Sequence, residues 1–324
     1  GNNVLTISST ETITGGAADD TITLATTITS GNVNLGGGTD TLTLANGTNS
    51  LTVTTVETVH GGSGTDTITL GNATNGITFF NVEAITGGTG ADTVTLATAF
   101  TGSINLAAGS DSLTLSSDGA NTVTVSNTET ITGGSQDDKI TLGAALASGI
   151  IDLGDGSDTL KLANATNSVT VSNVETITGG TGADTVKLGT AWNGNIDLAG
   201  GTDNLTLSSL GNNTLTATNI ETITGGSLDD SVTVSNAMAS GTINLGTGND
   251  TLTLSSAGAN TLTVSNVETL TGGALNDKIT LGAAQSGGAI DLGGGTDTLI
   301  LAAGTNSVTV ANVETITGGT GADT

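Results

Sequence analysis

The sequence predicts an all-β fold, a parallel β-solenoid built from units of about 46 residues. Three observations lead to this prediction. A glutamate in "VETITGG" and its variants recurs at a nearly fixed step, short strands alternate with glycine turns, and the chain contains no proline. A fixed period of this length is typical of stacked solenoids, and the absence of proline suits strands that must all donate to a ladder.

The glutamate defines the unit. It stands at Glu11, Glu57, Glu83, Glu129, Glu175, Glu221, Glu268 and Glu314, in steps of 46, 26, 46, 46, 46, 47 and 46 residues. The prediction therefore treats residues 1–324 as one continuous solenoid with a short unit at 57–82. Because residues 1–11 align with 211–221, the chain opens in the middle of a unit, and we expect a segment of a longer chain.

Each unit contains five short strands. In residues 175–220 the strand centres are 8 to 10 residues apart, and apolar and polar side chains alternate along each strand. This spacing is too short for a strand–helix–strand crossover. It favours a two-sided roll with one strand per half-turn, in which each full unit makes five half-turns and successive units alternate edges. The other possibility is a pair of unequal coils, the longer one with three strands, with all units in phase. Either arrangement makes the short unit lack one whole coil.

The glycine turns are of three kinds. The first follows GGxGxD and ends at Asp20, Asp66, Asp92, Asp138, Asp184, Asp230, Asp277 and Asp323. The second follows GxGxD and ends at Asp40, Asp111, Asp158, Asp203, Asp250 and Asp297. The third ends at Asn3, Asn49, Asn75, Asn121, Asn167, Asn213, Asn260 and Asn306. The separation from each Asn to the next first-kind Asp is constant, and that from this Asp to the second-kind Asp varies by a single position. We therefore expect Asn–Asp–Asp columns along the edges.

Such columns predict a cation site. Glycines allow tight left-handed turns and leave backbone carbonyls free to face inward. Stacked turns that end in aspartate then gather several oxygens, which suits the 6 to 8 hard ligands of Ca²⁺. "GGSGTDTIT" (61–69), "GGTGADTVT" (87–95) and "GGTGADTVK" (179–187) resemble the calcium-binding nonapeptide of the RTX (repeats-in-toxin) family. The resemblance implies a right-handed β-roll, Ca²⁺ between consecutive turns, and a secreted bacterial protein.

The predicted calcium ligands are the aspartates of the first two turn kinds and four glycines. They are Asp20, Asp40, Asp66, Asp92, Asp111, Asp138, Asp158, Asp184, Asp203, Asp230, Asp250, Asp277, Asp297, Gly87, Gly90, Gly179 and Gly182. We expect the best sites at Asp92 with Asp111 and at Asp184 with Asp203. Asp66 has no second-kind Asp on the next rung, that is, one coil later in the chain. Its site should therefore bind Ca²⁺ more weakly. "GGAADD", "GGSQDD", "GGSLDD" and "GGALND" depart from the motif by losing the third glycine.

The composition argues against several classes of function. Thirty acids face four lysines and no arginine, a net charge of −26, which argues against a nucleic-acid partner and an anionic membrane surface. No apolar run approaches the roughly 20 residues that span a bilayer, so we expect no membrane insertion. Serine and aspartate lack an accompanying histidine, so no enzyme site is predicted. We read His60 as an outward side chain and the "VET" glutamates as exposed strand starts, with cation binding as the alternative.

One apolar position recurs four residues after the second strand. Ile28, Phe100, Leu146, Trp192 and Met238 occupy it, with Gln285 as its last copy, and we expect these side chains to plug the core. Carbohydrate stacking on Trp192 is the alternative.

The function that follows is structural. We expect a Ca²⁺-stabilised segment of an extracellular surface layer, sheath, filament or adhesin stalk, located at the cell surface and self-associating end to end or in a lattice. The alternative is an ice-binding solenoid that uses outward pairs such as Thr21/Thr23, Thr67/Thr69, Thr93/Thr95 and Thr251/Thr253. Against it, Lys139, Lys161, Lys187, Lys278 and Ile300 interrupt those columns.

Overall fold

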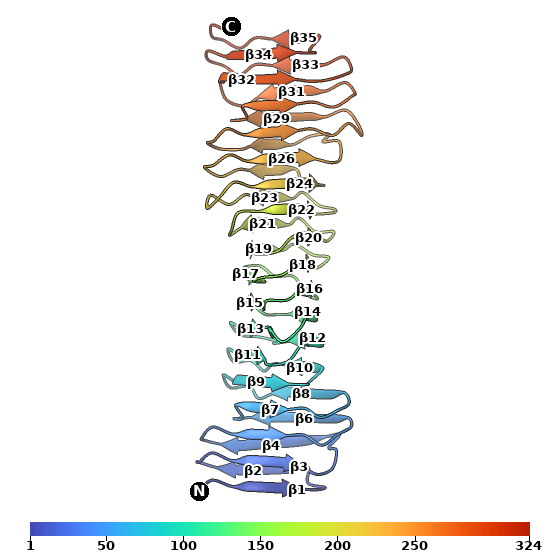
Figure 1. Ribbon diagram of the computed structural model, residues 1–324, viewed down its shortest axis with the longest axis vertical. Helices are drawn as coiled ribbons and strands as arrows, with labels where there is room; N and C mark the ends of the chain where they lie inside the picture. The colour runs from blue at the N-terminus through green and yellow to red at the C-terminus, as the bar shows by residue number, and fades with distance from the viewer. The chain divides into compact units, whose positions relative to one another are not determined.

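The computed structural model describes residues 1–324 as a parallel β-solenoid without a helix, whose coils take about 19 residues each. The chain falls into two compact units, residues 1–163 and 164–324. In each unit the odd-numbered strands form one parallel sheet and the even-numbered strands form the other (Figure 1). The chain contains no segment that qualifies as a membrane-spanning helix.

Consecutive strands of the first unit alternate between the two sheets. Its odd sheet comprises β1 (Val4–Ile7), β3 (Thr21–Leu24), β5 (Thr41–Thr43), β7 (Thr58–His60), β9 (Gly76–Phe80), β11 (Thr93–Leu96), β13 (Ser112–Thr114), β15 (Thr130–Thr132) and β17 (Gly149–Asp152). Its even sheet comprises β2 (Thr12–Gly16), β4 (Gly31–Gly36), β6 (Asn49–Thr54), β8 (Asp66–Leu70), β10 (Ala84–Thr86), β12 (Thr101–Asn105), β14 (Thr122–Ser126), β16 (Lys139–Leu142) and β18 (Thr159–Lys161).

The second unit repeats this arrangement. Its odd sheet comprises β19 (Ser168–Ser172), β21 (Thr185–Leu188), β23 (Asn204–Thr206), β25 (Thr222–Thr224), β27 (Thr242–Asn244), β29 (Thr261–Ser265), β31 (Lys278–Leu281), β33 (Thr298–Ile300) and β35 (Thr315–Thr317). Its even sheet comprises β20 (Thr176–Thr178), β22 (Asn193–Asp197), β24 (Thr214–Thr218), β26 (Ser231–Val234), β28 (Thr251–Thr253), β30 (Thr269–Thr271), β32 (Ser286–Asp291) and β34 (Ser307–Ala311).

The two-sided arrangement with one strand per half-turn is confirmed. Residues one coil apart are register partners within a sheet, such as Val4 with Thr21 and Thr101 with Thr122. The "VETITGG" strands therefore alternate sheets: β2 and β10 lie in the even sheet, and β7 and β15 in the odd one. The coil is the structural repeat, and one full period of the sequence equals two and a half coils.

The short unit lacks one whole coil, as predicted. Three half-turns lead from β7 to β10, whereas five lead from β2 to β7. The register continues through this region, with Val59 opposite Phe79 and Ile77 opposite Val94, and these side chains are all buried. Removing a complete circuit therefore leaves every later side chain on its original side of the sheet.

The interior is thin and aliphatic. Inward residues of successive coils stack in rows, such as Leu113 next to Val94 and Ile131, and these three are at most 1% exposed. Each such side chain contributes roughly 1.5–3 kcal/mol when it leaves water. The plug residues belong to this core, because Ile28, Phe100, Leu146, Trp192 and Met238 are 3–6% exposed. Trp192 is therefore a core side chain, and the carbohydrate-stacking alternative is wrong.

A nearby glycine makes room for the plugs Ile28, Phe100, Trp192 and Met238. A Cβ on Gly194 would lie 3.3 Å from Nε1 of Trp192, and one on Gly102 would lie 3.1 Å from a ring carbon of Phe100. The plug side chain therefore occupies the inward space that any other residue at this strand position would fill. In the last copy, the side-chain amide of Gln285 donates to the Val267 carbonyl instead of packing as a hydrocarbon.

Candidate functional site

The structure places asparagine, aspartate, aspartate and glutamate on successive rungs along the solenoid edges, in what we call the polar columns. In the column that ends at Glu221, the backbone amide and side-chain amide of Asn167 both donate to Oδ1 of Asp184 at 2.9 Å. The amide of Asp184 donates to Oδ1 of Asp203 at 2.6 Å, and the amide of Asp203 donates to Oε2 of Glu221 at 2.8 Å. The predicted Asn–Asp–Asp columns are confirmed.

The same contacts recur along both units. Asn75, Asp92, Asp111 and Glu129 repeat them, with distances of 2.7–3.1 Å. The column members other than the glutamates are deeply buried in most copies; Asp184, Asp203 and Asn213 are 0% exposed. Parallel strands on successive rungs hydrogen-bond to one another, whereas the amides at the turns need other acceptors, and the column supplies them.

The asparagine works as a relay, which explains why this position is not an aspartate. Oδ1 of Asn213 accepts the amide of the plug residue Trp192 at 3.1 Å, while its Nδ2 donates to Oδ1 of Asp230 at 2.7 Å. An aspartate could accept from Trp192 but would face the Asp230 carboxylate without a donor. None of these relay asparagines has a left-handed backbone; the asparagines that do are others, such as Asn219 (φ 52°), two residues before Glu221.

Two classes of aspartate differ in how fully their oxygens are engaged. In what we call the first aspartates, which end GGxGxD turns, both oxygens accept: Oδ2 of Asp184 takes the amide of Gly180 at 3.3 Å. In five of the second aspartates, which end GxGxD turns, Oδ2 is buried without a hydrogen-bond partner: Asp40, Asp111, Asp203, Asp250 and Asp297.

The turn conformation explains this difference. The residue four positions before a second aspartate is left-handed, as at Gly36 (φ 96°) and Ala199 (φ 65°). Its amide therefore points elsewhere; that of Ala199 donates to Oδ1 of Asp197 at 2.9 Å.

Gly64 has the expected left-handed backbone (φ 133°), whereas four other glycines of first-kind turns serve a different purpose. Gly87 and Gly179 do not adopt a left-handed φ; a Cβ on either would lie 2.2–2.3 Å from a carbonyl oxygen of the next rung. Gly90 and Gly182 similarly leave no room beside a rung. These glycines are therefore required by the close approach of neighbouring turns.

The motif departures carry their own contact. Where the third glycine is replaced, the added acid or amide accepts an amide from the next rung. Oδ1 of Asp19 takes the amide of Thr39 at 2.8 Å, and Oδ1 of Asn276 takes that of Thr296 at 2.9 Å. These turns therefore use the added side chain for a hydrogen bond to the next rung.

Burial raises the pKa of four of the second aspartates. Removal from water is the main cause that raises the pKa of Asp203 to about 6; the hydrogen bond from Asp184 opposes it, and the charges of Asp184 and Glu221 add to it. Burial likewise raises the pKa of Asp250 to about 6 and raises that of Asp111 and Asp297. Hydrogen bonds from Asn3 and Gly16 lower the pKa of the first aspartate Asp20.

The "VET" glutamates are column members, and the interpretation as exposed strand starts is wrong for most of them. Glu57, Glu83, Glu129, Glu221 and Glu268 are half-buried, and each accepts the amide of an aspartate one rung earlier at 2.7–2.9 Å. Glu314 makes the same contact at 2.7 Å. The signal that could have revealed this is their nearly constant separation in sequence from the aspartate one coil earlier.

No protein-family model and no curated protein matches this sequence. Among solved structures, the chain is similar to a hyperactive, Ca²⁺-dependent, beta-helical antifreeze protein from an Antarctic bacterium. The identity is 17%, the match covers 93% of this chain and 84% of that chain, and the TM-score is 0.23. A likeness at that score carries no argument about what this chain does.

The columns partly fit a cation. No group of three His, Cys, Asp or Glu side chains converges in a way that could hold a metal ion. First aspartates such as Asp184 use both oxygens for amides, whereas the second aspartates named above keep one buried oxygen without a donor. A Ca²⁺ ion at a second aspartate would therefore draw its remaining oxygen ligands from the main chain or water.

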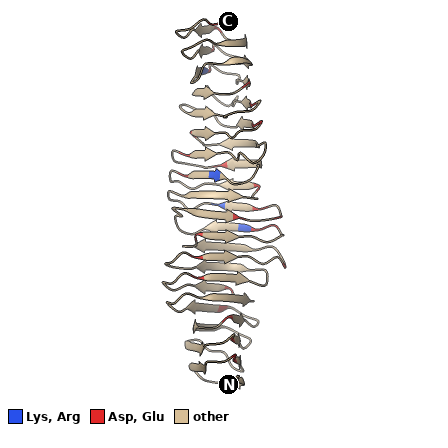
Figure 2. Cartoon of the chain, turned by 90° about the vertical axis from the view of Figure 1, so that its left-hand side faces the viewer, with Lys and Arg blue, Asp and Glu red and all other residues tan.

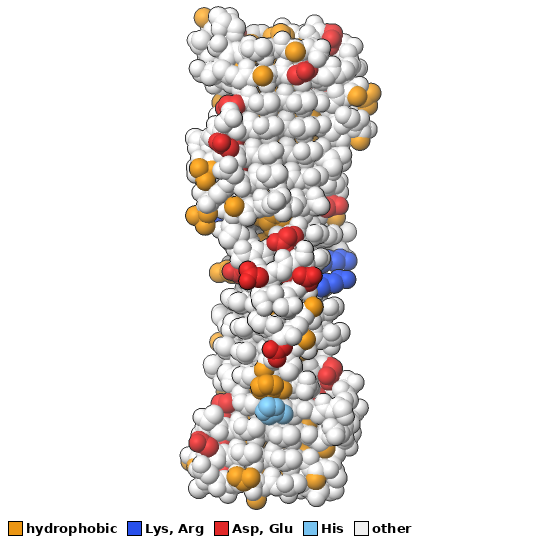
Figure 3. Space-filling model, in the orientation of Figure 1, with side chains coloured by type: hydrophobic (Ala, Val, Ile, Leu, Met, Phe, Trp, Pro, Cys, Tyr) orange, Lys and Arg blue, Asp and Glu red, His pale blue; other side chains and the backbone are white.

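The outer faces of the sheets carry hydroxyl and amide groups. Most of the visible surface is neither charged nor hydrophobic (Figure 3), and acidic residues gather at the strand ends and turns (Figure 2). One outward row on the odd sheet of the first unit is threonine on seven consecutive rungs: Thr21, Thr41, Thr58, Thr78, Thr95, Thr114 and Thr132. Beside it, the rings of His60 and Phe80 stack with centroids 4.3 Å apart, so His60 faces outward as expected.

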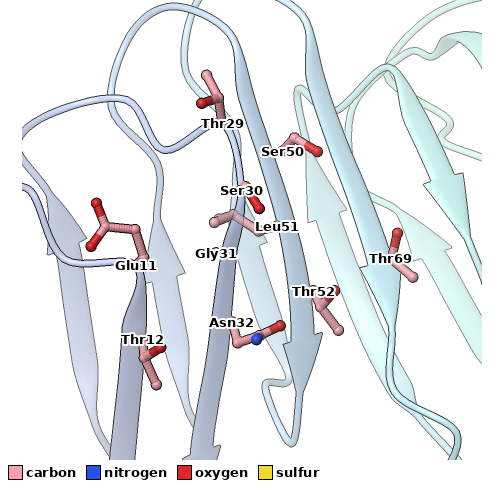
Figure 4. Close-up of a pocket in the computed structure, with 10 residues that line it drawn as sticks. All are labelled: Glu11, Thr12, Thr29, Ser30, Gly31, Asn32, Ser50, Leu51, Thr52 and Thr69. Atoms are coloured by element: carbon pink, nitrogen blue, oxygen red, sulfur yellow. The ribbon is translucent and has the colours of Figure 1, made fainter.

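A polar groove of about 240 Å³ lies on the surface of the first unit. Its walls are outward side chains of β2, β4, β6 and β8, including Asn32, Thr52 and Thr69, with Glu11 at one side (Figure 4). The groove holds a single carboxylate and neither histidine nor lysine, so it presents no acid–base pair for catalysis.

Proposed function

We propose that the chain is a structural segment of an extracellular surface layer, sheath, filament or adhesin stalk, in which Ca²⁺ stabilises the solenoid. The observation that carries this proposal is the repetition of the polar column on rung after rung of both units. An enzyme or a protein that binds a small molecule concentrates its convergent polar groups in one pocket. Here the same contacts recur along each unit, and what grows with every rung is length, by roughly 4.8 Å.

Copies of such a segment would associate end to end or side by side in an assembly outside the cell. The proposal includes no enzymatic activity, because His60 is the single histidine and its ring lies against Phe80.

The net charge of the chain supports a role for calcium. Thirty acids and four lysines give a net charge of −26, and self-repulsion of this kind opposes a compact state. When bound, Ca²⁺ supplies positive charge next to carboxylates that the fold has removed from water. An ion that binds the folded chain and not the unfolded one stabilises the folded chain by mass action.

Electron microscopy of the native material tests the structural role. Antibodies raised against this chain, detected with gold particles on thin sections of the source cells, should label a regular layer, filament or stalk outside the cell envelope. Antibodies absorbed with the purified chain serve as the control. Label confined to the cell interior would contradict the proposal.

A second candidate is ice binding, and the row of seven threonines favours it. Rungs repeat every 4.8 Å or so and alternate residues of a strand lie roughly 6.7 Å apart, which gives a flat, regular set of hydroxyl and methyl groups. Thr23 and Thr43 widen the row at one end, and Thr93 and Thr130 widen it at the other. No lysine lies in this row, in contrast to the rows of the even sheet that contain Lys139 and Lys161.

Thermal hysteresis tests this candidate. Thr78→Lys places a charge at the centre of the row, whereas Thr67→Lys places the same charge on the even sheet of the same unit. An ice-binding row would lose most of its hysteresis in Thr78→Lys and little in Thr67→Lys. The absence of hysteresis and ice shaping in the unaltered chain would eliminate the candidate.

A further inference from the structure

The two classes of aspartate in one polar column differ in how many of their carboxylate oxygens accept a hydrogen bond. Asp184 accepts amides from Asn167 and Gly180, so both carboxylate oxygens have donors. Asp203, on the next rung, accepts only the amide of Asp184 on Oδ1, and its Oδ2 has no donor. Both side chains are 0% exposed, so water does not make up the difference at the surface.

The neighbouring side chains in the column provide neither a hydrogen-bond donor nor a positive charge for Oδ2 of Asp203. The side chains on the adjacent rungs of its column are Asp184 and Glu221, which are both acidic. A buried carboxylate oxygen without a donor is costly, and further negative charge beside it increases the cost. The same situation recurs at Asp111, between Asp92 and Glu129, and at Asp250, between Asp230 and Glu268.

We propose that the second aspartates, and not the first aspartates of the GGxGxD turns, are the side chains that bind calcium. The proposal rests on the calcium role proposed above and assigns it to particular residues. A hard divalent cation supplies the positive partner that the free Oδ2 lacks, and its other ligands are main-chain or water oxygens. The first aspartates act as acceptors for amides of the preceding rung and of their own turn.

The short unit provides an internal comparison. The amide of Asp66 donates directly to Oε2 of Glu83 at 2.8 Å, so this column has no second aspartate. Both oxygens of Asp66 accept amides, from Asn49 and from Gly62. The assignment therefore gives this column no ion, and Asp66→Asn should leave the number of bound ions unchanged.

Two triple variants with the same change in net charge test the assignment. One is Asp203→Asn, Asp250→Asn and Asp297→Asn; the other is Asp184→Asn, Asp230→Asn and Asp277→Asn. Bound Ca²⁺ is counted by equilibrium dialysis of the full chain, and circular dichroism checks folding. We expect the first variant to bind three fewer ions than the unaltered chain and the second to bind the same number. If a triple variant does not fold, the single changes Asp203→Asn and Asp184→Asn give a loss of one ion and no loss.

The outcomes separate the two proposals. If the variant of the first aspartates loses ions while that of the second aspartates keeps them, or if both lose equally, the assignment is wrong and the calcium role stands. If the unaltered chain binds no Ca²⁺, both the assignment and the calcium role are wrong.

Discussion

The backbone amide of Asp184 donates a 2.6 Å hydrogen bond to Oδ1 of Asp203, a residue 19 positions later in the chain. Two carboxylates are thus held on adjacent rungs inside the protein, and an amide connects them. The contact recurs in every complete column, so an alteration in one column tests a contact that is repeated along the chain.

The relay asparagine should not tolerate a charge. Asn213→Asp would place a carboxylate against Oδ1 of Asp230, where the side-chain amide now donates at 2.7 Å. Burying an unpaired charge costs about 3–5 kcal/mol, so the free energy of unfolding should fall by that amount. Trp192 is the single tryptophan, and its fluorescence during urea unfolding reports on the second unit. Asn195→Asp, on the exposed face of β22, is the control and should change stability little.

The glycine beneath a plug should resist enlargement. Gly194→Ala would place Cβ 2.3 Å from the carbonyl oxygen of Glu175 and 3.3 Å from the Trp192 indole nitrogen. Overpacking of this kind costs about 1–3 kcal/mol. Gly200→Ala is the matched control, because nothing lies within 4 Å of its added Cβ. Equal urea midpoints for the two variants would show that the space under Gly194 is not tightly filled.

Stability should depend on pH between about 4 and 6 when calcium is absent. Folding raises the pKa of Asp203 and Asp250 from the unfolded value near 4 to about 6, so the folded chain holds these protons more tightly. Their contribution is complete below the unfolded pKa and is lost as pH rises through 6. The lowered pKa of Asp323 acts only at lower pH.

Thermal melting in EGTA, followed by Trp192 fluorescence, measures this dependence. The melting temperature should rise as the pH falls from 8 to 5. Asp203→Asn with Asp250→Asn should flatten the profile, because neither amide titrates. A melting temperature that falls over this range would contradict the sign of the pKa shifts.

Calcium removal at neutral pH should destabilise the solenoid. The carboxylates of the second aspartates are then charged, buried and without a counter-ion, and each bound Ca²⁺ stabilises the folded state by about 2.7 kcal/mol at a concentration 100 times its Kd. Melting curves with excess Ca²⁺ and with EGTA measure the difference, and Mg²⁺ at the same ionic strength separates specific binding from screening. An unchanged melting temperature would contradict the calcium role.

Much of the architecture was predictable because its determinants are local. Alternation such as Thr185, Val186, Lys187 and Leu188 defines an inward face within one strand, and turn spacing defines the half-coil. The columns were predictable from sequence separations alone, since residues one coil apart must lie on the same edge.

The roles within a column were not predictable from the motif. GGxGxD and GxGxD turns look alike as letters, yet the backbone at Ala199 is left-handed and that at Gly180 is not. This single torsion determines whether an amide reaches the aspartate four residues later. It depends on how the turn packs on its neighbouring rungs, which a one-dimensional pattern does not contain.

The half-coil excess in the sequence period has a geometric consequence. Within either compact unit, two successive 46-residue sequence repeats are related by a screw operation. It combines half a revolution about the solenoid axis with an advance of two and a half coils. The short unit, at one and a half coils, gives the same half revolution. Inserting one unit into a gene would therefore exchange front and back for everything downstream, whereas inserting two would restore them. A solenoid that grows by tandem duplication in this way acquires two faces of similar chemistry instead of one specialised face.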